Sequence, residues 1–279
     1  MPNENTRQGQ FIQSLDRGLM ILEAVANSKH PVSLSELTDI IGIDRSSVFR
    51  LASTLRRRGF LACPAGRKDY ILGSSMWRLL HRYDWGDMLI KVSHPHLKLL
   101  AAQSNETAHL TIREGKQVLF IDHADANHMI AVAGQTGELA PLHCTAHGKA
   151  LLADFSEREL KTLLGLRPLH TYTRKTLTSV KDLSKVCAQI RRDGFAIDDA
   201  EYAEELRCVA APIRSGDGVI VGSIGISAPL NRLSKEQCRA YGEKVSKIAR
   251  QIGAMLSQVD EDSEMAPTVQ RFAGSANAT

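Results

Sequence analysis

The sequence predicts an α+β protein with two folded domains that are joined by a helix. A chain of 279 residues has room for about two domains. Apolar residues recur at helical spacing in the first 60 positions. Residues 106–134 and 194–229 instead contain strand-like runs separated by turns. Adjacent strand runs favour an antiparallel sheet, which the remaining helical runs would flank.

Residues 33–60 have the pattern of a helix-turn-helix, with a turn at Gly42 between two short helices. Asp44 precedes the second helix as its expected N-cap, and the positive end of that helix would then face DNA phosphates. The apolar positions of both helices fall on one side, where they can be buried together: Leu34, Leu37, Ile41, Val48, Leu51 and Leu55.

The outer face of the second helix carries arginine and serine, which can contact base edges and phosphates. Three arginines and Gly59 close this helix, and residues 60–73 then read as a two-stranded hairpin with a basic tip, a wing. An ordinary helical hairpin with solvated arginines is the alternative. The residues predicted to contact DNA are Arg45, Ser46, Ser47, Arg50, Arg56, Arg57, Arg67 and Lys68.

A helix before this motif and a helix after it complete the first half of the chain. The upstream helix is expected to cover the pair through Ile12, Leu15, Leu19 and Leu22, whereas residues 74–91 form a stiff connecting helix with the apolar stripe Met76, Leu79, Leu80 and Tyr83. The predicted organisation is a disordered segment at 1–10, a DNA-binding domain at 11–73, the connecting helix at 74–91, a second domain at 92–260 and a disordered tail at 261–279.

Composition limits the partners. The net charge of +4 is small, so positive charge matters mainly where it clusters, between Arg45 and Lys68. No apolar run approaches the roughly 18 residues of a membrane helix, so no membrane partner is expected. Five cysteines without a CxxC pair argue against a disulfide framework and favour a cytoplasmic location.

Three separated motifs resemble the IclR family of bacterial transcription regulators: the winged segment, GELAPLHCTAHGKALLA at 137–153, and the run from GFAIDDA to GSIGISAP at 194–229. The resemblance covers about residues 11–258. It implies a winged helix-turn-helix, a linker helix that helps the chain dimerise, and an effector-binding domain with a GAF-like sheet. Family members commonly bind small organic acids or aromatic catabolites and regulate neighbouring operons, most as repressors and some as activators. The implied partners are double-stranded operator DNA, a small-molecule effector and further copies of the chain, in a homodimer or a dimer of dimers.

The effector site is expected where the second motif begins a helix. Thr145 can cap that helix, its free N–H groups favour an anion, and Lys149 adds a positive charge if it points inward. Any tightly packed strand-to-helix junction would have the same sequence. The resemblance implies effector contacts from Ala146, His147, Asp198, Cys208 and Ser227, with an apolar lining from Met129 and Val132.

The chain departs from its relatives at two of these positions. His147 stands where acid-binding relatives often have a small residue, and Gly225 replaces a serine found in some of them. Both departures leave the identity of the effector open.

Three other functions are less favoured. Cys144 and His147 could form a thiol nucleophile with its base, giving an enzyme with an accessory DNA-binding domain, but no third residue orients them and no catalytic residue is predicted. No metal or other cofactor is predicted either, because the histidines match no zinc signature: His94, His96, His109, His123, His128 and His143. A purely architectural DNA-binding protein would differ in that no small molecule changes its affinity for DNA.

Overall fold

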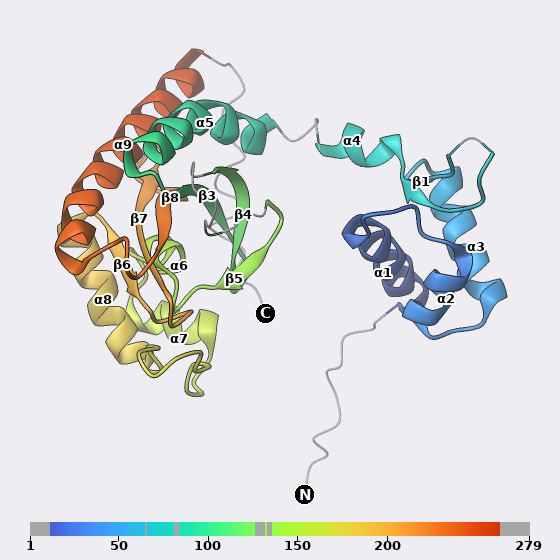
Figure 1. Ribbon diagram of the computed structural model, residues 1–279, viewed down its shortest axis with the longest axis horizontal. Coiled ribbons are helices and arrows are strands. Elements are labelled where there is room, and N and C mark those ends of the chain that lie inside the picture. Colours follow the sequence, from blue (N-terminus) through green and yellow to red (C-terminus); the bar gives the residue numbers. More distant parts are fainter. Residues whose placement is uncertain (1–11, 65, 81–83, 126–131, 133–135, 263–279) are drawn as a thin grey trace, which may run out of the picture. The chain divides into compact units, whose positions relative to one another are not determined.

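The computed structural model describes residues 12–64, 66–80, 84–125, 132 and 136–262 (Figure 1). The chain divides into two compact units, Met1–Trp85 and Gly86–Thr279. One is mainly helical with a two-stranded sheet, and the other is a larger sheet flanked by helices, so the α+β prediction is confirmed. The segments predicted to be disordered lie outside the described residues, except that the last helix extends to Asp262. No helix in the described ranges is long and apolar enough to cross a membrane.

The first unit is a winged helix-turn-helix. Its elements are α1 (Gln13–Asn27), α2 (Leu34–Ile41), α3 (Arg45–Arg57), β1 (Leu61–Ala62), β2 (Ile71–Leu72) and α4 (Ser74–Leu80). The antiparallel pair β1–β2 is the predicted wing. Leu37 and Val48 are fully buried between α2 and α3, as their spacing predicts.

Local sequence signals fix the ends of these helices. Ser33 and Glu36 form a capping box at the start of α2. Gly42 ends that helix in the left-handed region, with φ of 70°, a conformation that glycine adopts without steric cost. Asp44 caps α3 as predicted. The turn of the motif is therefore specified by two local signals, Gly42 and Asp44.

The buried face of α1 differs from the prediction. Its buried residues are Gly18, Ile21 and Val25. Ile12 and Leu15 of the predicted stripe are more than half exposed in the single chain. Because α1 carries apolar side chains on more than one face, helical spacing alone does not select the face that packs on α2 and α3.

The described strands of the second unit form one antiparallel sheet in the order β5-β4-β3-β8-β7-β6. The elements of this unit are α5 (Asp84–Ser104), β3 (Thr107–Glu114), β4 (Gln117–Ala124), β5 (Leu139–Pro141), α6 (Ala146–Leu151), α7 (Glu157–Leu164), α8 (Val180–Asp193), β6 (Ala196–Asp199), β7 (Leu206–Arg214), β8 (Ile220–Pro229) and α9 (Lys235–Asp262).

Helices cover the sheet from both sides (Figure 1). The long helix α9 packs along β7, and Leu89 of α5 lies against Gly222 of β8. On the other side α6 crosses β7 and β8, with α8 outside it. The core beneath α6 consists of small residues, among them Ala146, Ala196 and Ala210, so the helix can approach the strands closely.

Three predicted elements differ from the structure or fall outside it. α5 runs from 84 to 104 with Pro95 inside, whereas the connecting helix was predicted to end at residue 91. A proline removes one helical N–H but does not by itself end a packed helix. The range 74–91 contains α4 and the start of α5, while 81–83 lie outside the described residues. The end of the strand-like stretch predicted at 106–134 also lies outside them, at residues 126–131 and 133–135.

Candidate DNA-binding surface and effector site

The predicted DNA-contacting side chains lie on the open face of α3 and on the wing. Ser47 is half-buried. Arg56 donates from Nη1 to Cys63 Sγ at 3.8 Å, which ties the end of α3 to the wing. The exposed members of the predicted set are Arg45, Ser46, Arg50, Arg56 and Arg57 of α3, with Arg67 and Lys68 on the wing.

The N-terminus of α3 already holds a carboxylate. The Ser47 backbone N–H donates to Asp44 Oδ1 at 2.9 Å, and the Ser46 hydroxyl donates to the same atom at 2.5 Å. The Ser46 hydroxyl bond, followed by the bonds from Ser47, lowers the pKa of Asp44 to about 2. The Asp44 carboxylate neutralises much of the partial positive charge at the start of α3, which was predicted to face DNA phosphates. Positive potential on this face therefore comes mainly from the arginines.

Sequence reasoning missed Phe49. This side chain is 51% exposed, and it lies one turn after Arg45 and next to Arg50. A large aromatic residue that does not pack into the domain core is unusual on a basic helix face, where it can contact a thymine methyl group. The helical spacing could have predicted that Phe49 is exposed, because Phe49 falls outside the stripe of Val48, Leu51 and Leu55.

The predicted effector residues of the strands form one row across the second sheet. Asp198 on β6 is the register partner of Cys208 on β7, which is the partner of Ser227 on β8. Ser227 is in turn opposite Thr107 on β3. Directly opposed residues project from the same face of a sheet, so these four side chains form a polar row. Thr107 was not predicted, because register between distant strands cannot be read from sequence.

One end of the polar row contacts Val132, a residue predicted to line the effector site. Thr107 Oγ1 donates to the backbone oxygen of Val132 at 2.7 Å. Val132 thus lies beside the row, but it contributes a polar backbone group as well as an apolar side chain. Met129, the other predicted lining residue, lies outside the described residues.

The start of α6 has the predicted cap, and Gly148 in this helix allows a close contact with a neighbouring segment. Thr145 Oγ1 accepts from the Gly148 N–H at 3.0 Å. A Cβ at Gly148 would lie 2.3 Å from the carbonyl oxygen of Leu142. The close approach that glycine permits is therefore one between two segments of this chain. Ala146, the first helical residue, is fully buried.

Lys149 points inward, where it forms an ion pair with Glu201. The Lys149 side chain is 2% exposed. The backbone N–H of Glu201 donates to Asp198 Oδ1 at 2.7 Å, so this pair lies beside the polar row. Burial raises the pKa of Asp198 to about 7, although the Glu201 N–H and the Lys149 charge act in the opposite direction. Near neutral pH, Asp198 can therefore act as a hydrogen-bond donor as well as an acceptor.

His147 projects from α6 onto the same face of the sheet. Its Nδ1 lies 2.9 Å from Ser223 Oγ and 3.2 Å from Thr111 Oγ1. Ser223 and Thr111 are register partners on β8 and β3, four residues along from the polar row. Burial lowers the pKa of His147 to about 3, so the imidazole is neutral.

The geometry of the described residues supports neither a Cys144 nucleophile nor a metal site. Burial raises the pKa of the Cys144 thiol to about 12, the opposite of what an activated nucleophile needs. Within the described ranges no group of three or more potential ligands is arranged to hold a metal ion. His94 instead pairs with Asp122 at 2.8 Å, and His123 lies 3.7 Å from Asp125. His128 lies outside the described residues.

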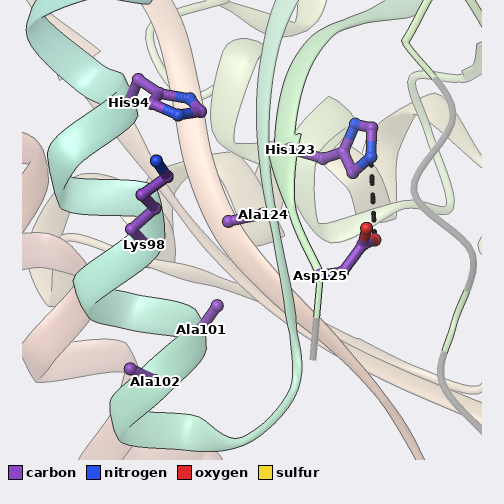
Figure 2. Close-up of a pocket in the computed structure, with 7 residues that line it drawn as sticks. All are labelled: His94, Lys98, Ala101, Ala102, His123, Ala124 and Asp125. Carbon is purple, nitrogen blue, oxygen red and sulfur yellow. Dashed lines mark ion pairs between the residues drawn. The ribbon is translucent and has the colours of Figure 1, made fainter. Parts of the chain in front are cut away.

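A cavity of about 360 Å³ lies between α5 and the end of β4, away from the polar row (Figure 2). Among the described residues, no predicted effector residue lines it, and four of them are buried: Ala146, His147, Asp198 and Ser227. The buried polar groups instead converge at the polar row. The residues lining the cavity are His94, Lys98, Ala101, Ala102, His123, Ala124 and Asp125.

Both units match the same family. The family described as "IclR helix-turn-helix domain" matches residues 14–62, and the one described as "Bacterial transcriptional regulator IclR C-terminal" matches residues 83–254. The chain belongs to the IclR family. It is 31% identical over 243 residues to the transcriptional repressor IclR of Escherichia coli, covering 86% of this chain and 89% of the relative.

Solved structures agree with this assignment. The Thermotoga maritima IclR structure has a TM-score of 0.71 at 25% identity and covers 88% of this chain and 100% of its own. An IclR homolog from Microbacterium hydrocarbonoxydans, complexed with 4-hydroxybenzoate, has a TM-score of 0.76 at 21% identity, covers 88% and 99%, and supports the fold. The chain is thus a DNA-binding transcriptional regulator of the IclR family and not an enzyme.

Proposed function

We propose that this IclR-family chain is a repressor that leaves its operator when a small organic acid binds the second unit. The observation that carries the proposal is the polar row, in which groups from four strands converge on one buried face. A fold that needed only a hydrophobic core would place apolar residues there. Repression is the function of the related E. coli protein, and the homolog complexed with 4-hydroxybenzoate makes an aromatic acid a reasonable ligand class.

In this proposal α3 lies in the major groove. Ser46, Ser47 and Arg50 contact base edges, and the exposed Phe49 adds an apolar contact. The other arginines and the wing position the DNA backbone, because their exposed charges can reach phosphates without reading sequence. This second set is Arg45, Arg56, Arg57, Arg67 and Lys68.

The effector carboxylate binds at the polar row, between the strands and α6. Ser227 offers a hydroxyl donor and Cys208 a weak thiol donor, while the Thr107 hydroxyl donates to Val132. Asp198 shares its proton with the acid, which removes the repulsion that two carboxylates would otherwise have. Ala146 and His147 cover the ligand from α6, and Met129 and Val132 complete the lining.

The regulator acts as a homodimer or a dimer of dimers. One winged unit makes a modest interface with DNA, whereas two units on half-sites about one helical turn apart multiply affinity and match two-fold symmetry. Sedimentation on a DNA fragment would show the stoichiometry. A single chain bound per operator at working concentrations would contradict this part of the proposal.

The central test combines DNA binding with a panel of small organic and aromatic acids. Fluorescence anisotropy would measure affinity for the DNA region upstream of the gene, with and without each acid. A coupling of about 1–3 kcal/mol, typical of allosteric proteins, would weaken DNA binding by roughly 5- to 150-fold. Deleting the gene should raise expression from the same region. An acid that binds the second unit yet leaves DNA affinity unchanged would overturn the regulatory part.

A further inference from the structure

Two buried histidines next to the polar row each have a ring nitrogen without a partner. His109 Nδ1 and His147 Nε2 make no hydrogen bond within the described part of the chain. The ring centroids of the two residues lie 6.0 Å apart, and Phe120 packs edge-on against both, at 5.2 and 5.8 Å. Buried polar atoms are normally paired, because an unpaired one has lost its water without replacement. The pair therefore indicates a missing polar partner.

Strand register places this pair on the same sheet face as the polar row. His109 is opposite Gly225 on β8, two residues before Ser227. His109 and Ser227 are thus diagonal neighbours on one face, a relation that separates side chains by about 7 Å. His147 reaches the same region from α6, where Ser223 and Thr111 hold its Nδ1 and leave Nε2 open.

The pair suits a neutral polar group better than a second anion. Burial lowers the pKa of His109 to about 4 and that of His147 to about 3, so both rings are uncharged near neutral pH. The neighbouring buried cation, Lys149, is already paired with Glu201. A hydroxyl group can both donate and accept, so it satisfies either tautomer of an imidazole. A buried carboxylate would find no opposite charge here.

We propose that His109 and His147 determine effector specificity by binding a hydroxyl group of the effector. The domain then selects hydroxy acids whose hydroxyl lies about 7 Å from the carboxylate, the spacing between the polar row and the pair. This inference rests on the proposed function, because the polar row must hold the carboxylate end. It also gives a role to His147, the residue that departs from acid-binding relatives.

The test uses matched pairs of acids on the full-length protein. The probes are benzoate with 4-hydroxybenzoate, phenylacetate with 4-hydroxyphenylacetate, and hexanoate with both 6-hydroxyhexanoate and adipate. Isothermal titration calorimetry would measure each dissociation constant for wild type, His147→Leu and His109→Leu. His143→Leu is the matched control, because His143 is also buried but its Nε2 bonds to the backbone oxygen of His170. Circular dichroism melts would check that each variant folds.

For wild type we expect at least one hydroxy acid to bind about tenfold more tightly than its plain partner, the effect of one well-made buried hydrogen bond. Each leucine variant at the pair should reduce this ratio to about one, whereas His143→Leu should keep the ratio. If one variant fails to fold, the other decides. A wild-type protein without hydroxyl preference, tighter binding of adipate than of 6-hydroxyhexanoate, or a ratio that survives in the folded variants would overturn the inference.

The two proposals fail in different ways. Plain acids that weaken DNA binding without any hydroxyl preference would leave the proposed function intact and overturn only the role of the histidine pair. If no acid of the set binds the wild-type protein, both proposals are contradicted.

Discussion

The two units of the chain present their functional residues in opposite settings. On α3 and the wing the basic side chains project into solvent, whereas the polar groups of the second sheet are nearly all buried. DNA is a large surface that exposed side chains can meet directly, but a small molecule binds strongly only where it is enclosed. Removing a basic side chain should therefore reduce DNA affinity in the first unit and folding stability in the second.

The largest effect is expected from Lys149→Met. The change leaves Glu201 buried without its cation, and breaking a buried ion pair on one side costs about 3–5 kcal/mol. Urea unfolding followed by circular dichroism would measure the loss. The matched control is Arg214→Met, because Arg214 and Asp154 form an exposed pair that should contribute about 1 kcal/mol or less. Equal losses from both variants would show that burial does not make the Lys149 pair more important for stability than the exposed pair.

Asp198→Asn should stabilise the protein at neutral and higher pH. The pKa of Asp198 rises from 3.8 to about 7 on folding, so between these values the folded state binds more protons than the unfolded state. Because Asp198 titrates in this range, the wild-type free energy of unfolding falls as pH rises from about 4 to about 7. An asparagine keeps an acceptor for the Glu201 N–H and carries no charge.

At pH 8 the asparagine variant should exceed wild type by about 4 kcal/mol in free energy of unfolding, and most of the difference should vanish near pH 4. Urea titrations at four pH values would measure both curves. The groups that face Asp198 and set its environment are Lys149, Glu201, Cys144 and Cys208. A difference that is constant with pH would mean that Asp198 does not titrate in this range.

Arg50→Ala should weaken operator binding by about 1–3 kcal/mol and blur the preference at one base position, without changing stability. Lys68→Ala is the comparison within the same unit. A phosphate contact should weaken all sequences alike and reduce the slope of log affinity against log salt by about one. Binding-site selection and salt titrations would separate the two. Equal losses of specificity would contradict the assignment of base and backbone contacts.

Asp44→Ala is expected to have the smallest effect. It is also the strongest test of the contrast between the two units. It removes the N-cap of α3 and should lower the melting temperature of the DNA-binding unit slightly. It also removes an anion near the DNA surface, so operator affinity measured well below the melting temperature should rise slightly. Asp44→Asn keeps the cap and separates the two effects. A loss of affinity in the asparagine variant would mean that the carboxylate itself contacts DNA.

Sequence reasoning succeeded where interactions are short-range. Gly42, Asp44 and Thr145 each act within four residues of their own position, so their roles as turn or cap follow from the local pattern. The resemblance supplied Asp198, Cys208 and Ser227, which strand register then brought into one row. Their roles in binding an effector stay predictions.

What the sequence could not provide depends on long-range packing. The helical pattern of α1 predicted a buried stripe beginning at Ile12 and Leu15, whereas Ile21 and Val25 form its buried face. The pairing of Lys149 with Glu201 joins residues 52 positions apart, and the proximity of His109 to His147 joins two elements in different layers. Neither contact leaves a periodic signal in the chain.

The position of β8 at the centre of the sheet restricts how this protein can evolve. Its side chains alternate between an apolar side, with Ile224 and Ile226, and a polar side, with Ser223 and Ser227, and neighbouring strands hold it on both edges. A deletion of one codon within β8 would shift the register by one residue, bury the serines against the apolar layer and turn the isoleucines toward the effector. This strand can therefore change by substitution but not by insertion or deletion, and length variation among descendants should be confined to the connecting loops.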